Sequence, residues 1–291
     1  MSWNYETETS LGQAMFGHAP VGDQRRAARL VRTFDTLCRH PGGTLPDKLS
    51  SPADLKALYR LCACESVTHA VLVAAIRGYT RARIAAQDDP VLLLHDATEL
   101  DYTTLESLTD HFGQIGKGTH RGYICHNVLA VNANSGEVLG LVDQMLHCRD
   151  EVPDDETLPE LRERDTRESL LWVKGTAHLP ADARLVDVAD QGASTFEFLE
   201  HQTRGGRRFV IRNGKTRKVY AGHQPAGPTH YLKEYVESLP ELGRFTMDVQ
   251  PQRGRKARTA AEFTLRGGPV LVLPPRRVNS AAVRALRPRC G

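Results

Sequence analysis

The sequence predicts an α+β protein in which a helical N-terminal region, residues 1–88, is followed by a mixed α/β region. Two observations lead to this fold class. Apolar residues recur at helical spacing up to about residue 86. After Gln87-Asp88-Asp89-Pro90, short apolar runs bounded by turn residues follow, and such runs are typical of strands. At 291 residues, the chain is long enough for one large domain or two ordinary ones.

The N-terminal region contains three predicted helices. The first begins at Asp23 and covers residues 23–40, with an apolar face and an opposite face of arginines. That opposite face carries Arg25, Arg29, Arg32 and Arg39. It is either a solvated surface or a surface for nucleic-acid phosphates, and its all-arginine content favours phosphate binding. Ser51-Pro52 predicts the start of a second helix, and a third is expected at about residues 66–86.

The second region begins with a strand at 91–95. Residues 123–131 and 138–147 are predicted to form a hairpin through Asn134-Ser135-Gly136, and a charged helix is expected at 155–173. Strands at 184–189 and 208–212 flank a short helix at 195–201. A helix at 231–237 and strands at 244–249, 261–265 and 269–273 are expected to form a smaller β-rich segment. Antiparallel strands that lead into alternating helices and strands are the order found in ribonuclease-H-like folds.

Composition narrows the class of protein. No apolar stretch is long enough to span a bilayer and no apolar signal region is found, so we expect a cytoplasmic protein. The six cysteines are scattered and lack zinc-finger spacing, which favours reduced thiols. The net charge is +3, but from Pro251 onward ten Lys and Arg residues stand against the single acid Glu262. This basic end favours a polyanionic partner, and an ordinary solvated tail is the alternative.

Two aspartates directly follow apolar runs that are predicted to be strands. Asp96 ends the run LLLHD, and Asp190 ends the run LVDVAD. Central strands of one sheet would bring the two carboxylates together, and close carboxylates are best tolerated with a divalent cation between them. Mg²⁺ fits, because it completes its coordination with water and phosphate oxygens. On spacing alone, two unrelated strand-end aspartates remain the alternative.

Several stretches resemble a known family. They are FGHAPVGDQRRAARLVR at 16–32, ALYRL at 57–61, the Asp-x-Thr-x-Leu run from Asp96, RGYICH at 121–126, VADQGASTFEFL at 188–199, residues 208–218 and PELG at 240–243. Together these resemble the DDE transposases of bacterial insertion sequences, within the cut-and-paste group that forms DNA hairpins at the transposon ends. The resemblance runs in order from about residue 12 to 278.

The resemblance implies a function and a set of residues. Asp96 and Asp190 would be the first two acids of the triad and ligands of Mg²⁺ or Mn²⁺, with Thr98 and His126 as supporting residues. The partner would be double-stranded DNA at the terminal inverted repeats, and full-length relatives would act as homodimers on DNA. A bacterial, nucleoid-associated location in the cytoplasm follows. The predicted DNA-binding residues are Arg25, Arg26, Arg29, Arg32, Arg121, Arg212, Lys215, Arg217 and Lys218.

The chain departs from the family pattern in two places. Gln191 and Ser194 stand where the family commonly has Arg and Asp after the second catalytic acid. No Tyr-x-x-Arg-Trp motif with the third acid, a glutamate, occurs, so we expect a C-terminally truncated chain with negligible strand cleavage alone. A non-catalytic end-binding protein or a decaying fragment are the alternatives. The expected domains are 1–88, DNA-binding; 89–212, an incomplete ribonuclease-H-like catalytic core; and 213–291, a β-rich insertion.

Overall fold

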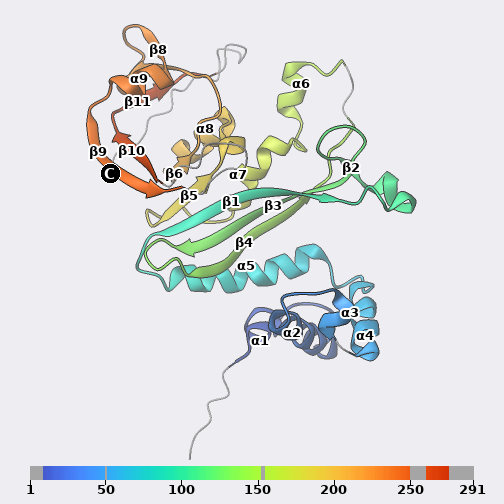
Figure 1. The fold of residues 1–291 in the computed structure, drawn as a ribbon. Helices are drawn as coiled ribbons and strands as arrows, with labels where there is room; N and C mark the ends of the chain where they lie inside the picture. The colour runs from blue at the N-terminus through green and yellow to red at the C-terminus, as the bar shows by residue number, and fades with distance from the viewer. Residues whose placement is uncertain (1–8, 50, 152–154, 250–259, 275–291) are drawn as a thin grey trace, which may run out of the picture. The chain divides into compact units, whose positions relative to one another are not determined.

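The computed structural model describes residues 9–49, 51–151, 155–249 and 260–274 (Figure 1). Its contacts divide the chain into two compact units, residues 1–188 and 189–291. The predicted boundary between residues 88 and 89 therefore falls inside the first unit. Most of the basic end predicted from Pro251 onward lies outside the described residues. The predicted order of a helical region followed by a mixed α/β region is confirmed.

The first unit begins with five helices. They are α1 (Leu11–Phe16), α2 (Gln24–Arg39), α3 (Leu45–Leu49), α4 (Pro52–Cys62) and α5 (His69–Ala85). The predicted starts of α2 and α4 are confirmed, because the Asp23 carboxylate caps α2 by accepting from the Arg26 N–H, and Pro52 opens α4. The short helices α1 and α3 were not predicted.

Contacts between distant residues hold α1 to α4 together. The Phe16 ring packs edge-on against Phe34 at 5.1 Å between centroids, which joins α1 to α2. The Gly12 N–H donates to the Asp35 carboxylate at 2.8 Å. The Ser66 hydroxyl donates to the carbonyl of buried Val21 at 2.8 Å, so the segment after α4 is tied back to the start of α2.

A sheet follows in the same unit, with the order β2-β3-β1-β5 and with β4 also paired to β3. These strands are β1 (Val91–Asp101), β2 (Gly113–Gln114), β3 (Arg121–Asn132), β4 (Val138–His147) and β5 (Leu185–Ala189). The predicted hairpin is confirmed, since β3 and β4 pair antiparallel, and Gly136 takes the positive φ of 73° that its turn requires. Between β1 and β2 lies a 3₁₀ helix, Glu106–His111.

The predicted end of the first strand at residue 95 was wrong. Strand β1 continues to Asp101, because its residues 91–101 all pair with residues 132–122 of β3. The first half of β1 alternates between buried and half-buried residues, whereas residues 96–99 are exposed. The change in polarity that looked like a strand end is therefore a change from buried to exposed strand.

Helix α5 packs on β4 and buries the core of the unit (Figure 1). The fully buried Thr80 hydroxyl donates to the Leu141 carbonyl at 2.9 Å. Gly140 lets the helix approach, because a Cβ there would lie 2.4 Å from the Thr80 hydroxyl oxygen. The Arg77 guanidinium binds buried Asp143 of β4, with its Nε 3.1 Å from the carboxylate. The apolar centre includes Leu93, Val128 and Leu139.

The predicted helix at 155–173 is instead three short pieces. These are α6 (Leu158–Glu163), a 3₁₀ turn (Glu168–Leu170) and α7 (Leu171–Thr176). The helix stops at Arg164, whose backbone is extended at ψ 115°, and whose side chain binds Glu156 at 2.9 Å. The Lys174 ammonium donates to the Asp165 carbonyl at 2.8 Å, which stabilises the break.

The second unit contains the helices and strands of the C-terminal part, most of which were predicted. They are a 3₁₀ turn (Gln191–Ala193), α8 (Phe196–Arg204), β6 (Arg208–Ile211), β7 (Lys218–Ala221), β8 (Thr229–Tyr231), α9 (Leu232–Ser238), β9 (Glu241–Asp248), β10 (Ala260–Arg266) and β11 (Val270–Val272). Strands β11, β7 and β8 form one sheet, and β9 and β10 form a hairpin. Strands β7 and β8 were not predicted, because they are only four and three residues long.

Candidate nucleic-acid interface and acidic residues

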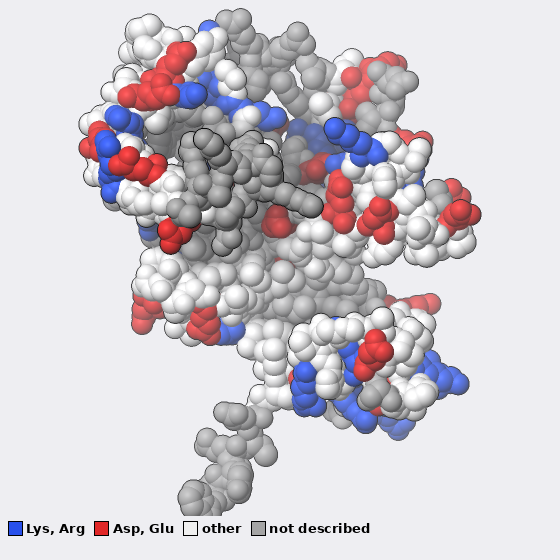
Figure 2. Space-filling model, viewed as in Figure 1, with Lys and Arg blue, Asp and Glu red and all other residues white. Residues whose placement is uncertain are grey.

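A basic groove lies between α2 and α4. It encloses about 380 Å³, and five of its lining residues are cations, namely Arg25, Arg26, Arg29, Lys56 and Arg60. Lys56 and Arg60 are exposed and come from α4. Figure 2 shows basic side chains gathered around these helices, at the lower end of the view. Cations from two helices that face one groove can contact several phosphates of a polyanion.

The predicted DNA-binding arginines of α2 are not equally available to contact phosphates. Arg29 binds the Asp54 carboxylate at 2.8 Å, and Arg32 approaches the same carboxylate at 3.4 Å. Arg26 donates to the Ser66 hydroxyl at 3.2 Å. These bonds hold α2 against α4 and its following turn. Arg25 is exposed on the first turn of α2 and lines the groove.

Asp96 lies in the middle of β1, and its backbone pairs with Asn127 of β3. Its side chain is exposed, as is that of Thr98, which pairs with Cys125. Successive residues of a strand point to opposite faces. Asp96 and Thr98 therefore share one face of β1, while His95 lies on the other face, where it is buried.

His126 is fully buried and belongs to a polar row inside the first unit. Its Nε2 lies 3.3 Å from Nδ1 of His95, and Nε2 of His95 lies 2.8 Å from the carboxylate of Asp187 on β5. Burial, aided by the neighbouring His95, lowers the pKa of His126 to about 4. The ring of Trp172 packs edge-on against His126 at 5.2 Å. His126 is thus a core residue at this position.

Arg121 opens β3 at the far end of β1. Its N–H donates to the Thr103 hydroxyl at 2.9 Å, and its carbonyl accepts from the Tyr102 N–H. The next residue, Gly122, is required by the pairing with β1, because a Cβ there would lie 1.9 Å from the Leu100 carbonyl oxygen. This close approach explains the glycine of the RGYICH stretch.

Asp190 lies in the second unit, directly after β5. Its carboxylate caps the 3₁₀ turn at 191–193 by accepting from the Gly192 N–H at 2.8 Å, and the residue is exposed. Asp96 and Asp190 therefore belong to different units. Among the described residues, no group of three or more His, Cys, Asp or Glu side chains is placed to hold a metal ion.

The predicted basic loop of the second unit contains both exposed and buried cations. Arg212 and Lys215 are exposed, and the Lys218 ammonium lies 5.6 Å from the centre of the Tyr231 ring. Arg217 differs from an exposed DNA-binding side chain, because it is only 8% exposed and donates to the Ser194 carbonyl at 2.6 Å. Burial lowers the pKa of Arg217. In this position its guanidinium fixes the loop to the segment after Asp190.

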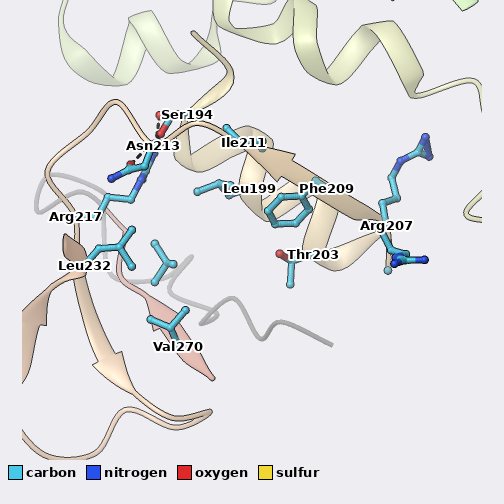
Figure 3. Close-up of a pocket in the computed structure, with 13 residues that line it drawn as sticks. Ser194, Leu199, Thr203, Arg207, Phe209, Ile211, Asn213, Arg217, Leu232 and Val270 are labelled. Atoms are coloured by element: carbon cyan, nitrogen blue, oxygen red, sulfur yellow. Dashed lines mark hydrogen bonds between the residues drawn. The ribbon is translucent and has the colours of Figure 1, made fainter. Parts of the chain in front are cut away.

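A largely apolar pocket of about 480 Å³ lies beside Arg217 (Figure 3). Leu199, Phe209 and Ile211 line one part of it, and Arg217 lies at the other end with Ser194 and Asn213. The Ser194 hydroxyl is 3.3 Å from the Asn213 side-chain oxygen. The bonds from Arg217 to Ser194 therefore hold the loop from inside the unit, at one end of this pocket.

Sequence reasoning missed several of these groups. Lys56 and Arg60 of the groove stand apart from the arginine stripe of α2, although their spacing of four residues on a predicted helix was a usable signal. Asp54 could not be paired with Arg29 and Arg32 without a known crossing of the helices. The bond between His95 and Asp187 joins residues 92 positions apart and left no sequence signal.

One comparison with known proteins bears on this arrangement. Residues 10–67 match a family model described as transposase DNA-binding. The match covers α1 to α4, including the whole basic groove, and ends before α5. It supports DNA as a partner and a transposase-related role for the chain. In the part of the chain that the structure describes, no helix is long and apolar enough to cross a membrane.

Proposed function

We propose that this protein is an insertion-sequence transposase component that recognises the terminal inverted repeats of its element through α1 to α4. The carrying observation is the match at residues 10–67 together with the groove that five cations line inside that segment. Phosphate contacts supply affinity and orientation, while base contacts supply sequence recognition. In this proposal Arg25, Lys56 and Arg60 bind phosphates. Arg26 and Arg29, which line the same groove, also hold the helices together.

Binding to DNA across a range of salt concentrations tests this proposal. We expect an end-containing duplex to bind more tightly than a scrambled one in a gel-shift titration. Removing two phosphate contacts with Lys56→Gln and Arg60→Gln should reduce the salt slope by about 2. Lys48→Gln is the matched control, because Lys48 lies on α3 of the same segment and donates to the Pro41 carbonyl instead of lining the groove. Equal affinity for both duplexes would rule out end recognition.

We further propose that Asp96 and Asp190 hold Mg²⁺ or Mn²⁺ as the first two acids of a DDE site on a ribonuclease-H-like sheet. Carboxylate oxygens suit these cations, which in phosphoryl-transfer sites bind one or two carboxylates together with waters and substrate phosphates. Both side chains are exposed, as ligands of a DNA-bound cation must be. When bound, the cation supplies activation of the attacking oxygen and stabilisation of the leaving one.

Alternation along β1 supports the accessibility that the proposal requires of Asp96. Strand β5 is next to β1 in the sheet. Val91 N–H donates to the Arg184 carbonyl, and His95 contacts Asp187, so the contacts advance in the same direction and the strands run parallel. Asp96 is one residue past His95 and therefore has the parity opposite to the buried pair, on the exposed face of β1.

A non-catalytic end-binding protein is the second candidate, because no residue of the sequence matches the family's third acid. A nicking assay on end-containing DNA with Mg²⁺ distinguishes the two. We expect the 291-residue chain to bind the DNA without cutting it. Mg²⁺-dependent nicking that disappears in Asp96→Ala would contradict the non-catalytic reading and establish a working metal site.

A further inference from the structure

Three polar side chains cross the core of the first unit on adjacent strands. His126 of β3, His95 of β1 and Asp187 of β5 form a continuous row, with atom separations of 3.3 Å and 2.8 Å. The exposed fractions of the three residues are 0%, 6% and 1%. They are flanked by buried Leu93 and Val128. A polar row therefore stands where the surrounding positions are apolar.

The two hydrogen bonds of the row need only one N–H on each imidazole. His126 Nε2–H then donates to His95 Nδ1, and His95 Nε2–H donates to the Asp187 carboxylate. The opposite tautomer of His126 would require a doubly protonated His95. It would also leave a buried N–H of His126 without an acceptor, since Nδ1 of that ring contacts no polar atom in the part of the chain described.

Helix α7 closes the row off from water. A Cβ at Gly175 would lie 2.7 Å from the Val128 side chain, 3.5 Å from the His126 ring and 3.6 Å from the His95 ring. The glycine thus allows the helix backbone to lie directly over both imidazoles. Trp172, one turn earlier, covers the other edge of His126. The side chains of the row are therefore buried from solvent.

A buried polar pair usually adds little stability compared with apolar side chains of similar size. The pair instead specifies the register of the two strands. A directional hydrogen bond forms in only one register, whereas apolar side chains can pack in several. The pair joins β1 to β5 one residue before Asp96 and three residues before Asp190. The bond is on the dry face of β1, and Asp96 is on the exposed face.

We propose that His95 and Asp187 are positioning residues whose cross-strand hydrogen bond fixes β1 against β5 and thereby holds Asp96 in place for the divalent cation. This inference rests on the proposed function of Asp96. It predicts that the pair governs the affinity for the cation more than the stability of the fold. Residues that orient metal ligands from outside typically change metal affinity by about 10- to 100-fold when they are replaced.

A titration of the full chain with Mn²⁺ tests the inference. Binding is monitored through the electron paramagnetic resonance signal of the free ion. The site is defined as the Mn²⁺ binding that the wild type shows and the Asp96→Ala variant does not. The double variant His95→Leu/Asp187→Leu replaces the pair with apolar side chains and should stay folded. Its melting temperature should fall moderately, because the buried His126 Nε2–H loses its acceptor. Its affinity at the Asp96-dependent site should fall by about 10- to 100-fold. Asp187→Asn keeps an acceptor for His95 and should bind Mn²⁺ nearly as the wild type does.

The possible results separate this inference from the function it rests on. If the wild type has no Asp96-dependent Mn²⁺ site, the proposed metal role fails and the inference fails with it. If the site is present and the double variant binds as the wild type does, only the positioning role is overturned. A double variant that unfolds under the conditions of the assay also contradicts the inference, because the pair would then act in stability.

Discussion

Protonation of His126 should make the folded state of this protein sensitive to acid above the range in which carboxylates titrate. The pKa of His126 is lowered from 6.5 to about 4, because the ring is buried and lies beside His95. An unfolded chain takes up this proton at about pH 6.5, whereas the folded chain takes it up only at about pH 4. The contribution to stability is therefore fully present above pH 6.5 and is lost as the pH falls toward 4.

The size of the effect follows from the shift. A difference of about 2.5 pKa units corresponds to about 3 kcal/mol once both states are protonated. Between pH 7 and pH 5, about 2 kcal/mol of this should be lost. We expect urea unfolding of the wild type to show this loss in the free energy of unfolding. His126→Gln, which keeps an N–H donor near the position of Nε2, should show a pH dependence smaller by about the same amount.

Comparing the wild type with His126→Gln separates His126 from the histidines and carboxylates remote from its ring, because those groups are present in both proteins. Unfolding should be followed by circular dichroism at constant ionic strength, at pH 7, 6 and 5. Equal losses of stability in the wild type and in His126→Gln would refute the reasoning. It would mean that the imidazole is hydrated or takes up its proton without cost in the folded protein.

Three further substitutions probe individual contacts. Asp54→Asn removes the carboxylate shared by Arg29 and Arg32. We expect the free energy of unfolding to fall by about 1 kcal/mol. DNA binding in a gel shift should become tighter and more salt-dependent, because both arginines are released for phosphates. Unchanged affinity would confine both arginines to a structural role. Gly122→Ala places a Cβ 1.9 Å from the Leu100 carbonyl oxygen. We expect about 3 kcal/mol of destabilisation and faster amide hydrogen exchange in residues 97–101. An unaltered exchange pattern would argue against the pairing of β1 with β3. Thr80→Val leaves the Leu141 carbonyl without its buried donor and should lower the free energy of chemical unfolding by about 1 to 3 kcal/mol. The control Thr36→Val removes an exposed hydrogen bond within α2 and should lower it clearly less.

Local signals in the sequence were enough to predict much of the fold. Asp23 and Pro52 marked the starts of α2 and α4, and Asn134-Ser135-Gly136 marked the β3–β4 turn, because capping and positive φ depend on the residue itself. The end of β1 was not predictable in the same way. Residues 96–101 stay in the strand because β3 pairs with them, and this partner lies some 25 residues later in the chain.

The same distinction, between local signals and contacts with distant residues, applies to the candidate site. The arginines of α2 were visible as a stripe, but which of them are tied down by Asp54 and Ser66 depends on how the helices cross. His126 was expected to support the site, yet its ring is buried in the core, because its position on β3 falls on the face covered by α7. Alternation predicts that a residue is on one face or the other, and only packing decides which face is dry.

The two halves of β1 differ in their surroundings, and the proposed metal role of Asp96 depends on both. Its first half is held by apolar neighbours and by the bond from His95 to Asp187, so its backbone is fixed from the core side. Its second half is exposed and carries Asp96 and Thr98, but it remains paired with β3 as far as residue 101. A ligand placed on a strand that is fixed on both sides loses little freedom when a cation binds, which favours binding. The strand end predicted from sequence would have left Asp96 in a loop, where the same carboxylate would have to be ordered by the cation itself.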